Sequence, residues 1–340
     1  MDLHNRFLKL SERYLPDVLE CVASVVGEAT PSGSNLARMH AYHFETGGKR
    51  LRAVIPFLVT ETFHADAAPL VPFAAACELV HNATLVHDDV QDGDAFRRGQ
   101  ETVWRRFGIP QAIDLGTAMH YYAVLAIHRL EVPGKLRDRV LSRLIRETLR
   151  VLDGQEREFA LKRMEEPSVS EYLEMVQHKT SGLFRLPMVG AADLCGAKEY
   201  TLEALSRAAS HLGILFQIQD DLLDLYGDKG RDERGSDVAE GKRSYLVVHA
   251  LATLTTRQSK RLREILDLDR ERTTPEHVAE VLDLLEACRA VQAAVAEIER
   301  QRAAAGESAR KAGAEAERLV EGLADLFLRP IRHLLGGPTG

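Results

Sequence analysis

Residues 70–92 read LVPFAAACELVHNATLVHDDVQD, and this stretch decides the fold of the chain. Residues 70–87 are apolar on nearly every face of a helix, which is unusual for a surface helix and typical of one at the centre of a bundle. Pro72 and Glu78 interrupt the apolar run, so the stretch does not predict a membrane span. The sequence therefore predicts a buried helix at the core of a helical protein.

Charged residues follow this helix at once. The segment LVHDDVQDGDAFRRG (85–99) holds four aspartates within seven residues and then two adjacent arginines. Like charges this close repel one another and are unfavourable to bury alone. We therefore expect a metal ion, an anion or both to neutralise the cluster.

The rest of the chain also has a helical pattern. Apolar residues recur every three or four positions, as in Leu15, Val18, Leu19 and Val22, whereas alternating strand patterns are hard to find. Breaks fall at TPSGSN (30–35), HADAAP (64–69), EVPG (131–134), EEPS (165–168), GDKGRDERGSD (227–237) and RTTPE (272–276). About ten helical segments joined by short connections predict an all-α fold, a single large helical bundle over residues 1–340.

Composition narrows the functional classes. The 340 residues are 45% hydrophobic and 28% charged, with a formal net charge of −7, which argues against a nucleic-acid binder that relies on bulk electrostatics. Four separated cysteines support neither a disulfide framework nor a zinc site. The first residues are amphipathic and unlike a secretion signal, so we expect a cytoplasmic protein without stable membrane insertion. The Ala-, Glu- and Arg-rich stretch 297–318 has the composition of a solvated helix or a mobile loop, and we attach no function to it.

One acidic pattern occurs twice. DDVQD (88–92) and DDLLD (220–224) both read D-D-x-x-D at the end of an apolar helix. Carboxylates at positions i and i+4 share one helix face and can bind one cation or two neighbouring ones. Mg²⁺ suits such a site, because it joins one or two carboxylates to a substrate phosphate and keeps several waters. One such pair alone is typical of a solvated surface, but two copies favour metal sites.

Basic residues alternate with the acidic motifs. GGKRLR (47–52) places Lys49, Arg50 and Arg52 after two glycines that allow close approach to an anion, and Arg97 and Arg98 follow the first acidic motif. Further donors are Lys179 with Thr180, and Lys242 with Arg243. His81 is either a core residue or a phosphate donor. The alternation favours a phosphate site.

These motifs resemble those of the all-trans isoprenyl (polyprenyl) diphosphate synthases, especially the geranylgeranyl and polyprenyl diphosphate synthases. The resemblance covers roughly residues 40–250 and rests on the following segments: GGKRLR (47–52), ELVHNATLVHDDVQD (78–92), RRG (97–99), GQ (154–155), KT (179–180), FQIQDDLLD (216–224), and GSD followed by GK (235–242). It implies an Mg²⁺-dependent prenyltransferase that condenses isopentenyl diphosphate with dimethylallyl, geranyl or farnesyl diphosphate, head to tail. A homodimer is implied in the same way.

The resemblance also implies roles for individual residues. Magnesium would be held by Asp88, Asp92, Asp220 and Asp224, with Asp89 and Asp221 nearby, in a cluster of three ions. Isopentenyl diphosphate would bind Lys49, Arg52, His81 and Arg98. The allylic diphosphate would bind Arg97, Lys179, Thr180, Gln217 and Lys242. Asp88, Asp92, Arg97, Lys179, Asp220 and Lys242 would carry catalysis, and the released diphosphate would accept the proton.

The chemistry explains these residue types. Ionisation of an allylic diphosphate leaves negative charge on the leaving group and a carbocation on carbon, so cations preorganised around the diphosphate lower the barrier. An apolar tunnel lined by residues 70–87 would exclude water. Four positions depart from the family pattern, namely Ala53, Thr117, Glu158 and the segment GKRSYL (241–246). None removes a predicted ligand.

The length of the product should depend on residues one helical turn, about 5.4 Å, before Asp88. Ala83 and Thr84 occupy these positions, and both are small. In the family that the chain resembles, aromatic residues at these positions are typical of enzymes that make short products. The resemblance therefore implies a product of C20 or longer. Tyr121 and Tyr122 form either a deeper stop or part of the core. We predict that Ala83→Phe shortens the product and that Tyr121→Ala or Tyr122→Ala lengthens it.

Three alternative functions stay open. A farnesyl diphosphate synthase would make a shorter product. A terpene cyclase resembles the fold, but it would replace DDLLD with an N-D-x-x-S-x-x-x-E type site and would lack GGKRLR. A regulatory subunit of a heteromeric synthase tends to lose the acidic motifs, and both are intact here.

Overall fold

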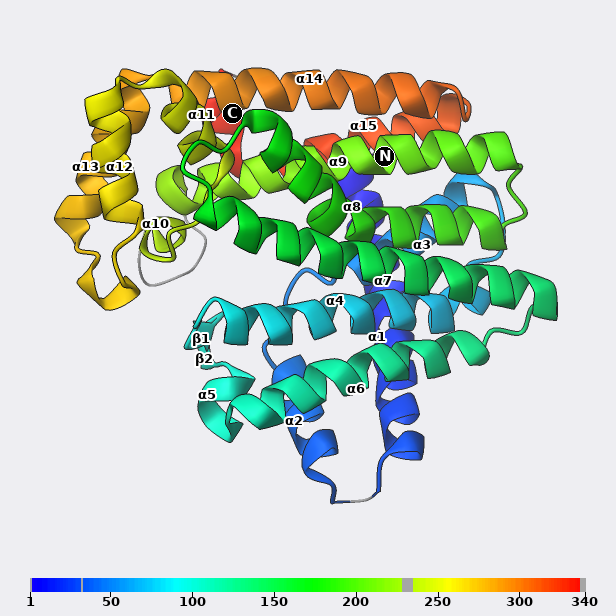
Figure 1. Ribbon diagram of the computed structural model, residues 1–340. Coiled ribbons are helices and arrows are strands. Elements are labelled where there is room, and N and C mark those ends of the chain that lie inside the picture. The colour runs from blue at the N-terminus through cyan, green and yellow to red at the C-terminus, as the bar shows by residue number, and fades with distance from the viewer. Residues whose placement is uncertain (1, 32, 228–234, 337–340) are drawn as a thin grey trace. The chain divides into compact units, whose positions relative to one another are not determined.

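The computed structural model describes residues 2–31, 33–227 and 235–336. Apart from one pair of two-residue strands, every regular element in these ranges is helical, so the predicted all-α fold is confirmed (Figure 1). The chain forms two compact units. Unit 1 comprises residues 1–148, 183–206 and 310–319, and unit 2 comprises residues 149–182, 207–309 and 320–340.

Unit 1 is built mainly from the first half of the chain. Its complete elements are α1 (Leu3–Ala29), α2 (Asn35–Phe44), α3 (Leu51–Thr62), η1 (Ala68–Leu70), α4 (Val71–Gln91), β1 (Phe96–Arg97), β2 (Gln100–Glu101), α5 (Val103–Phe107) and α6 (Ile109–His128). It also contains parts of α7 (Gly134–Arg163), α8 (Val169–Leu194), α9 (Glu199–Tyr226), α14 (Ala290–Arg310) and α15 (Ala314–Leu328).

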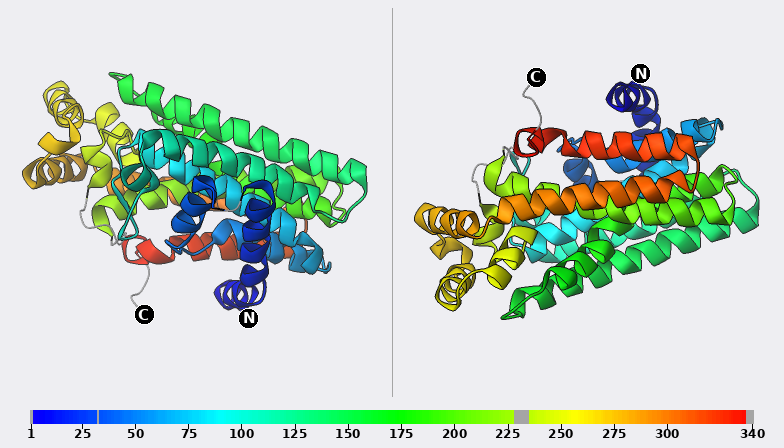
Figure 2. Two further views of the ribbon diagram at one scale, coloured as in Figure 1. Left: turned by 90° about the horizontal axis from the view of Figure 1, so that it is seen from below. Right: turned by 90° about the horizontal axis from the view of Figure 1, so that it is seen from above.

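The centre of unit 1 is α4, as residues 70–87 predict. Among its residues, Phe73, Leu79 and Ala83 are fully buried. The segment Ala68–Gln91 is long and apolar enough to cross a membrane, but 72% of the window that passes this test is buried inside the protein, so it is a core helix. Helix α6 packs along α4, and the two lie side by side in Figures 1 and 2. At their crossing, a Cβ on Gly116 would lie 2.3 Å from the His87 ring, so only glycine permits this approach.

Unit 2 contains the rest of α7, α8, α9, α14 and α15. Its complete elements are α10 (Ser236–Ala239), α11 (Tyr245–Thr253), α12 (Thr256–Leu266), η2 (Arg270–Arg272), α13 (Pro275–Ala287) and η3 (Arg329–Leu334). Helices α12 and α13 pack against each other as a pair. Each begins with a capping box, Thr255 with Gln258 and Thr274 with His277, so polar side chains satisfy the first free N–H groups.

The predicted breaks agree with the helix ends. TPSGSN separates α1 from α2, EVPG precedes α7, EEPS precedes α8 and RTTPE precedes α13. The break at 227–237 lies partly outside the described residues, but α9 ends at Tyr226 and α10 begins at Ser236. Residues 297–310 lie in α14 and residues 314–318 in α15, with a short connection at 311–313, and α14 buries a face that includes Ile298, Gln301 and Ala305.

Candidate active site

The first acidic motif ends α4. Asp88 and Asp89 lie in its last turn. Asp92 is the C-cap residue, and its N–H donates to the Asp88 carbonyl at 2.8 Å. The three carboxylates differ in burial: Asp88 and Asp92 are partly exposed, whereas Asp89 is 2% exposed. Neighbouring positions on a helix point about 100° apart, so Asp89 turns into the protein when Asp88 faces outward.

Asp89 is held by an arginine predicted to bind substrate. Arg97 Nη2 lies 2.6 Å from Asp89 Oδ1, and Arg97 Nε donates to the same oxygen at 2.8 Å. Burial raises the pKa of Asp89 to about 6, although the Arg97 charge acts to lower it. The pair therefore fixes Arg97 beside the acidic motif.

The hairpin that carries both arginines is anchored at Asp94. Phe96 pairs with Glu101 and Arg97 with Gln100 across the two short strands. The Asp94 carbonyl accepts Thr102 Oγ1 at 2.7 Å and Trp104 Nε1 at 2.8 Å. This anchor turns Arg97 inward and leaves Arg98 exposed. Trp104 was not predicted, because a single tryptophan outside any motif gives no signal in the sequence.

The GGKRLR segment meets Arg98. Gly47 and Gly48 have φ values of +69° and +119°, and Arg98 Nη1 donates to the Gly47 carbonyl. A Cβ on Gly48 would lie 2.2 Å from Arg98 Nη1, so the absence of a side chain at Gly48 leaves room for the Arg98 guanidinium. Lys49 is exposed. The anion site predicted at this segment therefore includes Arg98 in addition to the basic residues of the segment itself.

Arg52 and His81 lie close to these cations. The Arg52 guanidinium stacks over the Phe184 ring at 4.7 Å from its centroid. Burial lowers the pKa of His81 well below its ordinary value, and the charges of Arg52, Arg97 and Arg98 lower it further. His81 is therefore neutral, and its Nδ1 has no hydrogen-bond partner within the described part of the chain. Unit 1 brings together five predicted diphosphate ligands: Lys49, Arg52, His81, Arg97 and Arg98.

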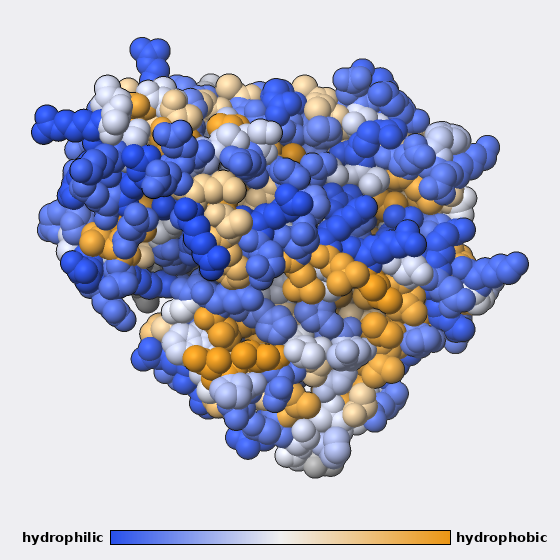
Figure 3. All heavy atoms as spheres, in the orientation of Figure 1, coloured by the Kyte–Doolittle hydropathy of each residue, from blue (hydrophilic) through white to orange (hydrophobic). Residues whose placement is uncertain are grey.

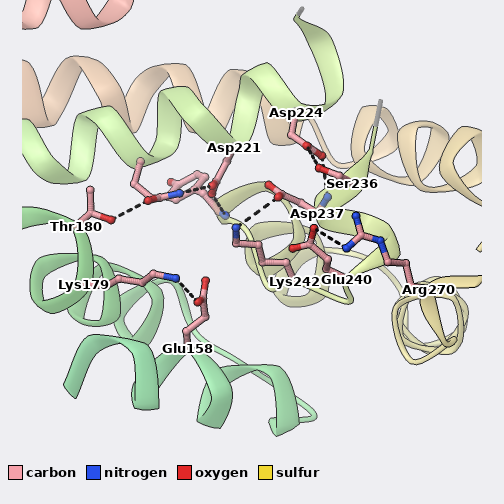
Figure 4. Close-up of polar contacts among 12 residues, drawn as sticks. Glu158, Lys179, Thr180, Asp221, Asp224, Ser236, Asp237, Glu240, Lys242 and Arg270 are labelled. Carbon is pink, nitrogen blue, oxygen red and sulfur yellow. Dashed lines mark hydrogen bonds and ion pairs between the residues drawn. The ribbon is translucent and has the colours of Figure 1, made fainter. Parts of the chain in front are cut away.

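The second acidic motif lies in the last two turns of α9. Asp220 is partly exposed, whereas Asp221 and Asp224 are buried. Asp221 Oδ2 accepts the Tyr172 hydroxyl at 2.7 Å and the Tyr245 N–H at 2.8 Å. Asp224 accepts Ser236 Oγ at 2.7 Å and the N–H of residue 237 at 3.1 Å (Figure 4). The motif is thereby tied to α8, α10 and the start of α11.

Asp221 mirrors Asp89 of the first motif. Each is the second aspartate of its D-D-x-x-D and is 2% exposed. Burial raises the pKa of Asp221 to about 6, and the Asp237 charge acts in the same direction. Tyr172 was not predicted, because nothing in the sequence distinguishes its hydroxyl from that of another core tyrosine.

The basic residues of unit 2 surround this motif. Lys179 pairs with Glu158, and Thr180 Oγ1 donates to Gln217 Oε1 at 2.7 Å. Lys242 Nζ lies 3.4 Å from Asp237 Oδ1. Figure 4 shows Lys179 and Glu158 pointing toward each other, and Lys242 directed at Asp237.

Glu158, which replaces the aspartate of the family pattern, is a buried partner of these lysines. Burial acts to raise its pKa, yet Lys179 and Lys242 together hold that pKa below its ordinary value. A Cβ on Gly154 would lie 2.2 Å from the Lys179 backbone nitrogen. The GQ motif at 154–155 therefore allows α7 to approach α8 beside Lys179.

The carboxylates suit a metal that is shared with substrate. Within the residues that the structure describes, no group of three or more His, Cys, Asp or Glu side chains is arranged to hold a metal ion. A pair of carboxylates fits Mg²⁺, because Mg²⁺ completes its shell with waters and substrate phosphate. Of the six predicted metal ligands, Asp89, Asp221 and Asp224 already accept hydrogen bonds from protein groups.

The predicted chain-length residues have different environments. Ala83 is fully buried and Thr84 is 8% exposed. Tyr122 is buried, and its hydroxyl lies 2.6 Å from Thr30 Oγ1. Tyr121 is 68% exposed, which gives no support to an interior stop at that position. Ala83, Thr84 and Tyr122 stay predicted determinants of product length.

Comparison with known proteins identifies relatives of the chain. The profile of the polyprenyl synthetase family matches residues 34–285. A short chain isoprenyl diphosphate synthase of Methanocaldococcus jannaschii is 37% identical, covering 70% of this chain and 72% of the relative. A geranylgeranyl pyrophosphate synthase of Geoglobus acetivorans is 38% identical, covering 68% of this chain and 73% of the relative.

Solved structures share the fold. The geranylgeranyl pyrophosphate synthetase of Pyrococcus horikoshii superimposes with a TM-score of 0.84 at 28% identity, over 96% of this chain and 98% of that one. A geranylgeranyl pyrophosphate synthase of Corynebacterium glutamicum, solved with isoprenyl diphosphate and magnesium, has a TM-score of 0.82 over 95% of this chain and 98% of that one. At 21% identity, the second likeness concerns the fold alone.

Proposed function

Because the chain belongs to the polyprenyl synthetase family, we propose that it condenses isopentenyl diphosphate with an allylic diphosphate, head to tail, to give a longer all-trans prenyl diphosphate. The matched profile covers residues 34–285, which include both acidic motifs and all the basic segments. Relatives at 37% and 38% identity carry names of the same activity. Since the profile extends over both compact units, we propose that residues 1–340 act as one catalytic domain.

One observation carries the proposal: each D-D-x-x-D motif has basic diphosphate donors in its own unit. In unit 1, Arg97 is paired to the motif through Asp89, and its charge acts on His81 together with those of Arg52 and Arg98. In unit 2, Lys179 and Lys242 both act on Glu158. Acidic and basic groups side by side are what a complex of a diphosphate with a cation requires.

We propose Mg²⁺ as the cation, held by Asp88 and Asp92 in one unit and by Asp220 and Asp224 in the other, with three ions in total. When bound, Mg²⁺ neutralises negative charge that develops on the leaving diphosphate. The protein's own part is electrostatic, since some of its cations are already fixed before the substrate arrives. Arg97 and Lys179 are the clearest cases, because each is held by a buried carboxylate.

The proposed product is C20 or longer. Ala83 and Thr84, one turn before the first motif, are small and buried, and the relative from Geoglobus acetivorans is named a geranylgeranyl pyrophosphate synthase. We further propose a cytoplasmic homodimer. Its support is a row of exposed apolar side chains on α6: Ile109, Ile113, Tyr121 and Leu125.

Purified protein, Mg²⁺, isopentenyl diphosphate and each of the three allylic primers in turn provide the test. We expect longer prenyl diphosphates, identified by chromatography after dephosphorylation, and the primer used best will be the preferred one. Asp88→Ala and Asp220→Ala should each lower turnover by at least ~10²-fold, because charge stabilisation of the leaving group is lost.

Other outcomes point to the alternative functions. Hydrocarbon products indicate a terpene cyclase, and a farnesyl product indicates a shorter-chain synthase. Absence of any turnover in the isolated protein contradicts the proposal and favours a regulatory subunit. Near-normal rates in Asp88→Ala or Asp220→Ala remove that motif from the mechanism.

A further inference from the structure

Arg50 differs from the two basic residues beside it. Lys49 is exposed and Arg52 is partly exposed, whereas the Arg50 side chain is only 6% exposed. Its backbone is left-handed, with φ +46° and ψ +39°, and it occupies the N-cap of α3. A non-glycine residue adopts this conformation only where the surrounding structure fixes it. The contacts of the Arg50 side chain hold its backbone in this conformation.

The guanidinium of Arg50 has several acceptors. Its Nη1 donates to Glu78 Oε1 at 3.0 Å and to Asn82 Oδ1 at 3.4 Å, and its Nη2 donates to the Phe44 carbonyl at 2.8 Å. The guanidinium carbon also lies 4.8 Å from the centroid of the Phe44 ring. Together with His43, whose Nε2 lies 3.0 Å from Asn82 Oδ1, these residues form what we call the Arg50 network.

The amide of Asn82 has a defined orientation in this network. Its Nδ2 donates to the Glu78 carbonyl at 2.8 Å and to Glu78 Oε1 at 2.9 Å, while its Oδ1 faces Arg50 and His43. A flipped amide would set its oxygen against two other oxygens and its NH₂ against a guanidinium. His43 therefore donates from Nε2. Burial, with the charge of Arg97, lowers the pKa of His43 to about 3, so it donates as a neutral ring.

The network joins three segments around one proposed ligand. Glu78 and Asn82 are one turn apart on α4, and His81 lies between them in the sequence. Phe44 ends α2, and Arg50 precedes α3. The start of α3, which carries Lys49 and Arg52, is thereby attached to the turn of α4 that carries His81.

The charges of the network nearly cancel. Arg50 and Glu78 form a buried pair of opposite sign, with side chains 6% and 2% exposed. Glu78 Oε2 has no hydrogen-bond partner within the described ranges, so the carboxylate depends on Arg50 for charge compensation. Such a pair gives an incoming anion little net attraction. The Arg50–Glu78 pair therefore contributes by positioning neighbouring residues rather than by attracting the anion.

We propose that Arg50 is a positioning residue for isopentenyl diphosphate: without touching substrate, it holds Lys49, Arg52 and His81 in the arrangement that binds this diphosphate. The inference rests on the proposed function. It predicts an effect on one substrate alone, because no member of the network belongs to the proposed ligands of the allylic diphosphate.

Steady-state kinetics of two variants tests this. Arg50→Lys keeps the charge opposite Glu78 but cannot reach three acceptors, and Asn82→Leu removes the acceptor shared by Arg50 and His43. In each, we expect the KM for isopentenyl diphosphate to rise about 10-fold or more, as for other residues that orient a ligand. The KM for the allylic primer should stay within about twofold of wild type. Arg38→Lys, an exposed arginine on α2, is the matched control.

A third variant guards against misfolding. Arg50→Met combined with Glu78→Met removes both buried charges together, which proteins tolerate better than the loss of one partner. If the double variant unfolds at the same urea concentration as the wild type, it is as stable as the wild type. It should then still show the raised KM for isopentenyl diphosphate. Unchanged KM values in folded variants, or equal rises for both substrates, overturn the inference. A wild-type protein that makes no prenyl diphosphate instead contradicts the proposed function, and the inference falls with it.

Discussion

The second aspartate of each acidic motif has a structural role in addition to any catalytic one. Asp89 holds Arg97, and Asp221 holds the Tyr172 hydroxyl and the Tyr245 backbone. Both are 2% exposed, whereas Asp88 and Asp220 are partly exposed. In both motifs, therefore, the second carboxylate is buried and organises its surroundings, whereas the first is partly exposed.

Gly154 permits a prediction at the residue scale. In Gly154→Ala the new methyl group would lie 2.2 Å from the Lys179 nitrogen and 2.5 Å from its Cα, and backbone atoms cannot turn aside. We expect a loss of ~1–3 kcal/mol in the free energy of unfolding, as for other overpacked sites. Turnover should also fall, because Lys179 must shift from Glu158. Urea denaturation and steady-state kinetics measure the two effects.

The control is Gly27→Ala in α1, where a Cβ would meet nothing within 4 Å. Alanine is the better helix former, so this variant should gain up to ~1 kcal/mol and keep its turnover. Wild-type stability in Gly154→Ala would contradict the close approach of α7 and α8 beside Lys179.

The sequence predicts which residues form the candidate site, but it does not predict their internal contacts. Repetition and spacing are local patterns, and the predicted carboxylates and cations rest on them. The partners of Asp89 and Asp221 depend on tertiary packing, and Tyr172 precedes Asp221 by 49 positions. Arg50, part of a predicted segment, was placed among the anion donors, yet its side chain is directed into the core.

At the scale of elements, α4 joins the core to the proposed reaction. Ala83 is fully buried on this helix, five residues before Asp88. Ala83→Phe is expected to shorten the main product, because the added ring would extend into the proposed path of the product one turn before the motif. Chromatography of the dephosphorylated products measures the change. Ala83→Gly, which adds no bulk, serves as control, and an unchanged profile in Ala83→Phe would remove Ala83 from the proposed path of the product.

Buried histidines on α2 give a pH-dependent prediction. Burial, with the charge of Arg50, lowers the pKa of His40 to about 4. The unfolded chain then binds a proton below pH 6.5 that the folded chain does not bind until about pH 4. His40 therefore costs no stability above pH 6.5, and its penalty grows by about 1.4 kcal/mol per pH unit as the pH falls through this window.

His40→Phe should remove that penalty. The free energy of unfolding of the variant, relative to wild type, should increase as the pH falls from 6.5 toward 4. His128→Gln, at an exposed position, is the control. Burial raises the pKa of Asp89 and Asp221, which makes the fold more stable as the pH falls, so the difference between variant and wild type is the measurement to use. A difference that is constant with pH would contradict a neutral, buried His40.

Breaks that contain Pro or Gly were predicted, but the described residues form 15 α-helices rather than about ten, because other boundaries, such as that between α11 and α12, contain neither residue. The face that α14 buries was not predicted. Its contacts include Ala294, Ala305 and Gln301, and alanine is common on buried and exposed helix faces alike. Composition therefore suggested a solvated helix or a loop, whereas the structure buries Ile298 and places Gln301 Oε1 2.6 Å from His211 Nδ1.

At the scale of the whole molecule, α6 carries an exposed apolar row. Ile109, Ile113, Tyr121 and Leu125 are 49%, 47%, 68% and 43% exposed, and their spacing of four, eight and four residues places them on one i, i+4 row, which turns about 40° around the helix at each step of four. Figure 3 shows apolar side chains gathered where Figure 1 draws α6. Exposed apolar side chains gathered in this way mark interfaces between proteins.

A second copy of the chain is the partner we propose for this row, since one helix face can pack on itself about a two-fold axis. Light scattering should give twice the chain mass of 37.8 kDa for the wild type. Ile113→Glu combined with Tyr121→Glu should give the single mass, because a buried, unpaired carboxylate opposes association. Leu8→Glu on α1, where the leucine is 50% exposed, is the matched control and should remain dimeric. A wild-type protein of single mass, or an α6 variant that stays dimeric, would show that this face does not join two copies.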